Sequence, residues 1–141
     1  MEVDARVLPD STRTAPEAAA AVGCEVGAIV KSLVFRIGDE AVLALVSGAN
    51  RADEGLLEAG FGARVERADA DFVRAATGYS IGGVPPLGHP RPLRTLVDED
   101  LLDHPVVWGA AGTPRSVFPM EPRELARLTG GTVVRLAARA R

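Results

Sequence analysis

One lysine, Lys31, stands among fifteen arginines in this chain of 141 residues. A guanidinium is planar and always charged, whereas an amine is compact and its pKa responds to its surroundings. We interpret the arginine bias as a consequence of the base composition of the coding sequence. Under that pressure we expect a lysine to persist where a guanidinium could not do the same work, so Lys31 is the first candidate functional residue.

A loop rich in glycine and proline, residues 78–90, is the second candidate. Gly82 and Gly83 allow a ligand to approach the main chain closely, and two prolines then fix the path of the backbone. The amides of Gly82, Gly83 and Val84 could therefore be held rigidly, which suits a carbonyl oxygen that gains charge during acyl transfer. The same composition also forms an ordinary tight turn, and both interpretations stay open.

Small residues gather again at 109–113, directly after the apolar residues 106–108. Main-chain amides from Gly109 to Gly112 could face a ligand there. Taken alone, this segment is more typical of a turn.

A serine hydrolase is one alternative, because residues 78–82 match the pattern G-x-S-x-G and Ser80, Asp103 and His104 follow in a suitable order. That motif needs a strand before the serine and a helix after it. Here a helical pattern precedes the serine and two prolines follow it. Asp103 and His104, being adjacent, would also have to reach the serine together, so we reject the triad.

The remaining reactive side chains indicate no cofactor chemistry. Cys24 has no evident base nearby in the sequence and is expected to be a small packed thiol. His89 and His104 join no cluster of ligands at metal spacing. The sequence contains no P-loop or dinucleotide fingerprint, and we expect neither a metal nor a cofactor.

Composition favours a single domain over residues 1–141, since the length allows one sizeable core. The hydrophobic fraction of 47% excludes wholesale disorder. No apolar run approaches the roughly 20 residues of a membrane span, and the first ten residues lack an apolar leader segment. One cysteine cannot form an internal disulfide, so we expect a cytoplasmic protein without membrane contact.

The net charge of −3 argues against a general nucleic-acid coat. Six arginines nevertheless follow residue 104, against Glu121 and Glu124. They could grip a polyanion locally or simply form a solvated face.

Local patterns predict the elements around Lys31. A capping box, Thr14 to Glu17, begins a helix that continues to Val22 and stops at Gly23. Residues 28–36 and 41–47 alternate as strands around a turn at 38–39. Both faces of this hairpin are apolar, so it is expected to lie centrally in a sheet, with Lys31 projecting from a row of hydrophobic side chains.

The rest of the chain mixes short helices and strands without strict alternation, which is typical of an α+β fold with a mixed sheet. Helices are predicted at 52–59, closed by Gly60, and from a cap at Asp69 to residue 76, with Gly78 as its exit. A helical turn is predicted at 98–102, and Glu121 opens a last helix ending at Gly130. Strands are predicted at 63–66, 93–97, 106–109, 115–118 and 132–136.

Three ordered motifs together resemble the YbaK/ProX family, the free-standing relatives of the editing domain of bacterial prolyl-tRNA synthetases. They are the strand 29–35 with its lysine, the loop 78–89, and residues 108–112 before a Pro-x-x-Leu helix. The resemblance covers about residues 14–136. It implies a mostly antiparallel, barrel-like sheet with flanking short helices.

The resemblance implies a trans-editing deacylase that hydrolyses the ester of a mischarged tRNA bearing a small amino acid, without a metal or a protein nucleophile. Lys31 would hold the terminal adenosine or its phosphate, and Gly82 would lie against the aminoacyl group. Substrate-binding roles are implied for Gly83, Val84, Pro86, Gly109, Ala110 and Gly112. Pro85 departs from the family, because relatives often have serine there.

The expected partner is mischarged aminoacyl-tRNA, which a synthetase or elongation factor could deliver, and the expected oligomeric state is a monomer or weak homodimer. A non-catalytic module that binds aminoacyl groups or nucleotides, or a regulatory partner of a synthetase, is the alternative.

Overall fold

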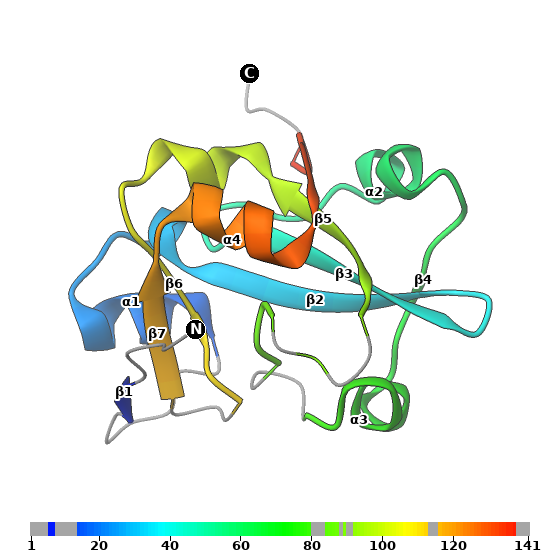
Figure 1. The fold of residues 1–141 in the computed structure, drawn as a ribbon, viewed down its shortest axis with the longest axis horizontal. Coiled ribbons are helices and arrows are strands. Elements are labelled where there is room, and N and C mark those ends of the chain that lie inside the picture. The colour runs from blue at the N-terminus through cyan, green and yellow to red at the C-terminus, as the bar shows by residue number, and fades with distance from the viewer. Residues whose placement is uncertain are drawn as a thin grey trace.

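A long hairpin, β2 (Val30–Ile37) and β3 (Glu40–Ser47), runs through the middle of the fold (Figure 1). Its register pairs Val30 with Ser47 and Ile37 with Glu40. The tight turn between the strands requires a left-handed residue, which Gly38 provides with φ of 60°. The computed structural model describes residues 6–7, 14–79, 84–87, 89, 92–112 and 116–137.

The described strands form two open sheets. In the five-stranded sheet the order is β4-β2-β3-β5-β8, with β2 antiparallel to both neighbours and β5 parallel to β3 and β8. The antiparallel three-stranded sheet has the order β1-β7-β6. An isolated bridge between Ile29 and Trp108 joins them. The other strands are β1 (Arg6–Val7), β4 (Glu66–Arg67), β5 (Arg94–Asp98), β6 (Val107–Ala110), β7 (Ser116–Met120) and β8 (Thr132–Val134).

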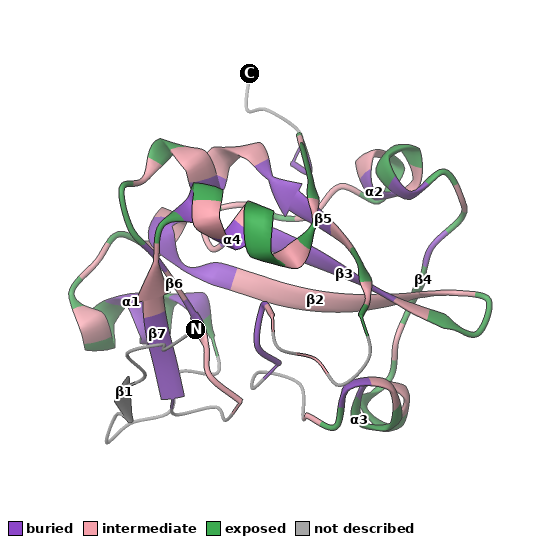
Figure 2. Ribbon diagram, in the orientation of Figure 1, coloured by how far each residue is buried: buried purple, intermediate pink, exposed green. Residues whose placement is uncertain are grey.

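The α+β class and the central position of the hairpin are confirmed. The barrel-like form is not, because neither sheet closes on itself within the described residues. β3 is the middle strand of its sheet, and its residues 42–47 are all buried (Figure 2).

Short helices flank the sheets, with α1 beside the three-stranded sheet and α2 and α3 near the tip of the hairpin (Figure 1). Thr14 caps α1 through its side chain, and Gly23 ends that helix in the left-handed region, as predicted. The caps at Asp69 and Gly78 are confirmed in the same way. The helices are α1 (Ala15–Val22), α2 (Glu54–Phe61), α3 (Ala70–Thr77) and α4 (Pro122–Thr129), with 3-10 turns η1 (Val26–Ala28) and η2 (Glu99–Asp103). No described helix combines the length and apolar character needed to cross a bilayer.

Helix α2 corrects the prediction that Gly60 ends it. The helix continues to Phe61, and Gly62, with φ of 74°, is the left-handed residue. Gly60 instead lies against β5, since an added Cβ would be 2.5 Å from Leu96 Cδ1. Its lack of a side chain therefore serves close packing between helix and strand.

Several predicted strands are also shifted. Ala28, predicted as the first residue of a strand, is the last residue of the 3-10 turn η1, and the last strand stops at Val134. The strand predicted at 63–66 is confined to Glu66–Arg67. The main-chain N–H of Val65 donates instead to Glu58 Oε2, at 3.0 Å, so a side chain of α2 occupies it.

The two faces of the hairpin pack on separate apolar clusters. Val30 and Val34 belong to one cluster with Leu43 and Leu45. Leu33 and Phe35 pack on the other, which contains Val42, Ala44, Val46 and Leu57. The predicted alternation is confirmed, and it places Lys31 on the same side of β2 as Leu33 and Phe35.

Candidate functional site

The ammonium of Lys31 is half-buried at the start of β2, where it donates a hydrogen bond to the main-chain oxygen of Asn50. Burial lowers the pKa of this amine, and the charge of Asp98 partly opposes the shift. An ammonium carries three N–H donors. Because Asn50 takes one and no other described residue accepts a hydrogen bond from this amine, two donors remain for a ligand.

A network of hydrogen bonds fixes the acceptor of Lys31. The side-chain amide of Asn50 donates to Asp98 Oδ2 at 2.9 Å and to Asp100 Oδ2 at 2.7 Å. Asp98 is fully buried and also accepts from the main-chain N–H groups of Ser47 and Asp100, both at 3.0 Å. The end of β5 thus positions the Asn50 carbonyl, and through it the lysine.

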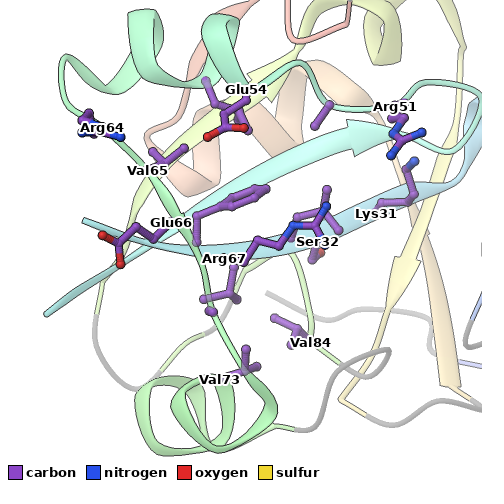
Figure 3. A pocket seen from close by; sticks show the side chains of 16 residues that line it. Lys31, Ser32, Arg51, Glu54, Arg64, Val65, Glu66, Arg67, Val73 and Val84 are labelled. Atoms are coloured by element: carbon purple, nitrogen blue, oxygen red, sulfur yellow. The ribbon is translucent and has the colours of Figure 1, made fainter. Parts of the chain in front are cut away.

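Two cavities meet at Lys31. The smaller has a volume of about 330 Å³ and lies between the start of β2, the N-terminus of α1 and residues 108–110. The larger, about 760 Å³, extends along β2 to α2, β4 and α3 (Figure 3). The residues that line both cavities are Lys31, Ser32, Leu33 and Val84.

The cavities follow a free edge of β2. On that side, β4 pairs with β2 only at Phe35 and Arg36. Residues 31–34 have no strand partner there within the described part of the chain, although β3 pairs with them on the other side. Main-chain groups at an unpaired edge can bind an added segment or ligand.

The structure brings several of the predicted site residues together. Val84 is buried and lines both cavities, and Gly109 and Ala110 line the smaller one with Lys31. Pro86 lies behind Gly109, because a Cβ added to that glycine would be 3.0 Å from Pro86 Cγ.

The structure does not place the other predicted site residues at the two cavities. Gly112, with φ of 103°, lies against the ring of Tyr79 and lines neither cavity. Gly82 and Gly83 lie outside the described residues. Their proposed contacts with the aminoacyl group therefore remain predictions.

Sequence reasoning missed three polar residues of the site. Ser32 Oγ is buried and has no hydrogen-bond partner among the described residues, although it lines both cavities. A serine within an apolar strand was a weak signal for it. Asn50 and Asp98 were also missed, although an acid directly after the apolar strand 93–97 was a visible sign of a buried carboxylate.

The structure also shows the surroundings of the cysteine and the histidines, for which the sequence predicts no catalytic or metal-binding role. Burial raises the pKa of the Cys24 thiol, which packs against the α1 cluster. The ring of His89 bonds through Nε2 to the oxygen of Pro85 at 2.7 Å, and burial lowers its pKa. Nδ1 of His104 lies 3.9 Å from Glu25. Ser80 falls outside the described residues, which contain no group of three or more potential metal ligands.

Gly109→Ala is expected to reduce ligand binding in the smaller cavity. The new methyl group would stand 3.0 Å from Pro86 Cγ and 3.2 Å from Cδ, so the segment carrying Val84 must shift. The neighbours need to move by only a few tenths of an ångström, less than the shift of about 1 Å that costs on the order of 100-fold in rate. We therefore expect a loss of about 10-fold or less in activity, with less than about 1.5 kcal/mol of destabilisation. Unchanged activity would show that the close contact between Gly109 and Pro86 is not needed for function.

The stability of the wild type relative to Lys31→Met is expected to increase as the pH rises from 7 to 10.5. Burial lowers the pKa of Lys31 from 10.5, so the folded protein binds the proton less tightly than the unfolded chain. This cost is fully present below the lowered pKa and is relieved as the pH rises from that value towards 10.5. The wild type should therefore gain stability relative to the methionine variant, which has no titrating group at this position, as the pH becomes alkaline. Thermal unfolding of both proteins from pH 7 to 10.5 measures it, and a difference independent of pH would contradict the argument.

Comparison with known proteins gives two matches by sequence. A model of the aminoacyl-tRNA editing domain matches residues 9–128. The uncharacterized protein YwhH of Bacillus subtilis (strain 168) is 30% identical over 129 residues, which cover 91% of this chain and 82% of that protein.

Two solved structures share the fold. One, described as a candidate trans-editing enzyme for prolyl tRNA synthetase, is 52% identical with a TM-score of 0.92, covering 97% of this chain and 87% of that one. The other, hypothetical protein APE2540, is 31% identical with a TM-score of 0.88, covering 96% of this chain and 91% of that one. With the motifs of Lys31, the glycine–proline loop and residues 108–112, these matches confirm the resemblance: the chain belongs to the aminoacyl-tRNA editing domain family.

Proposed function

We propose that this protein is a trans-editing hydrolase that cleaves the ester between a small amino acid and a mischarged tRNA. The observation that carries the proposal is the meeting of Lys31 with Val84, Gly109 and Ala110 around a cavity of about 330 Å³ in a member of the editing family. That volume is at the lower end of the range for ligand pockets, about 300–1,000 Å³.

The chemistry needs positioning more than a protein nucleophile. An aminoacyl ester is already activated, so orientation of a water molecule or of the substrate's own group, together with oxyanion stabilisation, is sufficient. The two remaining N–H groups of Lys31 hold the terminal adenosine or its phosphate. Gly82, with neighbouring amides of the loop, holds the acyl carbonyl in this proposal, and no metal takes part.

Side-chain size sets the selectivity. A small cavity excludes larger amino acids, whereas losing contact with one methylene group changes binding by only about 1–3 kcal/mol. Alanine, cysteine, serine and threonine are the candidate substrates. Pro85 influences this choice, because proline offers no N–H or hydroxyl and its carbonyl is already bonded to His89.

Delivery of the substrate by a synthetase or elongation factor fits the modest affinity for tRNA that a net charge of −3 suggests. Because one solved relative is described in connection with prolyl tRNA synthetase, tRNA for proline is the first substrate to test. We place the protein in the cytoplasm, as a monomer or weak homodimer.

The test is hydrolysis of a panel of tRNAs for proline and other amino acids, charged with alanine, cysteine, serine, threonine or the correct amino acid. We expect cleavage of at least one mischarged tRNA and none of the correctly charged species. Treating the enzyme with a chelator of divalent ions should leave the rate of ester hydrolysis unchanged. Tight binding of aminoacyl-tRNA without cleavage would favour a non-catalytic module, and inactivation by the chelator would reveal a metal.

A further inference from the structure

The larger cavity is locally positive although the protein is acidic. Four cationic side chains line it, Lys31, Arg51, Arg64 and Arg67, against the carboxylates of Glu54 and Glu66. The whole chain has a net charge of −3. A cavity with this local charge attracts an anionic ligand that the rest of the surface repels.

The three arginines of this cavity are free to bind. Arg51, Arg64 and Arg67 are exposed, and none forms an ion pair or side-chain hydrogen bond with another described residue. By contrast, Arg94 is bound to Glu40 and Arg127 to Glu124. Guanidinium groups bind phosphate through two parallel hydrogen bonds, so these three are suited to a polyphosphate chain.

The arginines are spread along the cavity. Figure 3 shows Arg51 with Lys31 at one end and Arg64 with Glu66 at the other. Arg51 directly follows Asn50, the residue to which Lys31 is bonded. The start of the positive lining is therefore fixed beside the amine where the two cavities meet.

The aromatic part of the lining suits a nucleobase. Phe35 is half-buried and lines the cavity, whereas the apolar lining residues Leu57, Val65 and Val73 are almost fully buried. Aromatic side chains stack unpaired bases, and nearby cations bind the phosphates of a single strand.

We propose that the larger cavity binds the last, unpaired nucleotides of the tRNA, with Arg51, Arg64 and Arg67 contacting their phosphates while the aminoacyl group occupies the smaller cavity. This inference rests on the proposed function. In this arrangement the larger cavity binds nucleotides and the smaller cavity binds the amino acid. Lys31, which lines both, lies beside the bond between the amino acid and the terminal nucleotide.

The test compares Arg51→Gln, Arg64→Gln, Arg67→Gln and the triple variant with a control, Arg123→Gln. Arg123 is an exposed arginine of α4, outside both cavities and without a partner among the described residues. Two probes are used, uncharged tRNA and the same tRNA lacking its last three nucleotides. Binding is measured over a series of salt concentrations, and KM and kcat are measured on the cleaved mischarged tRNA.

Each arginine that contacts a single-stranded phosphate should contribute about 0.7 to the slope of log affinity against log salt. We expect each cavity variant to lower that slope on intact tRNA and to raise KM with kcat nearly unchanged, whereas Arg123→Gln does neither. On trimmed tRNA the cavity variants should match the wild type.

If the wild type cleaves mischarged tRNA, two outcomes would overturn the assignment of the larger cavity to the unpaired nucleotides. One is a salt slope that the arginine variants do not change. The other is equal weakening of binding to intact and trimmed tRNA, which would mean that the arginines contact the paired stem. If the wild type cleaves no mischarged tRNA yet the arginines still discriminate intact from trimmed tRNA, the proposed function is wrong and the nucleotide site stands.

Discussion

Lys31→Arg will lose deacylation almost as completely as Lys31→Ala, although it keeps the positive charge. The half-buried amine donates to the Asn50 carbonyl at the junction of the two cavities. A guanidinium is larger and planar, and it presents its donors in a fixed fork instead of around one nitrogen. It cannot bond to that carbonyl and leave two donors directed at the substrate from the same point.

We expect kcat/KM to fall by about 10²-fold in both variants, because a substrate whose end is no longer held by Lys31 is misplaced, and a displacement of about 1 Å costs on that order. The measurement is single-turnover hydrolysis of the mischarged tRNA that the wild type cleaves best. Circular dichroism and thermal melting serve as controls for folding. Activity of Lys31→Arg equal to that of the wild type would refute the argument from amine geometry.

Asp98→Ala will have the largest effect on stability. This carboxylate is fully buried and accepts hydrogen bonds from the main chain of Ser47 and Asp100 and from the side chain of Asn50. Its removal leaves these donors without their acceptor, and each unsatisfied buried group costs about 1–3 kcal/mol. We expect the free energy of unfolding to fall by about 3 kcal/mol or more.

Asp100→Ala is the matched control, because its half-buried side chain accepts only from the Asn50 amide among the described residues. It should cost about 1 kcal/mol, as for a single hydrogen bond. Urea denaturation of the two variants and the wild type provides the comparison. Equal stability of Asp98→Ala and Asp100→Ala would show that the network does not depend on the buried carboxylate. Activity should also fall in Asp98→Ala, since the acceptor of Lys31 loses its support.

Much of the local structure could be predicted from the residues alone. The caps at Thr14 and Asp69 and the left-handed exits at Gly23 and Gly78 are confirmed. The alternation of buried side chains in the hairpin is confirmed as well. Both kinds of feature could be predicted because capping and side-chain periodicity depend on residues within a few positions of one another. The predicted end of α2 was wrong for the opposite reason. Gly60 packs against Leu96, a residue that is distant in the sequence, and does not end the helix.

The site shows the same division. The type of Lys31 and its place on an apolar strand were readable along the chain, and the motifs gave the family. Only the folded chain brings the lysine to Gly109 and Ala110, since that proximity arises where two separate sheets meet at Ile29 and Trp108. The parallel pairing of β3 with β5, and the burial of Asp98 at the end of β5, likewise come from contacts between distant segments. Periodicity within one strand carries no information about its neighbour in the sheet, so tertiary packing alone decides where the amine is held and what it faces.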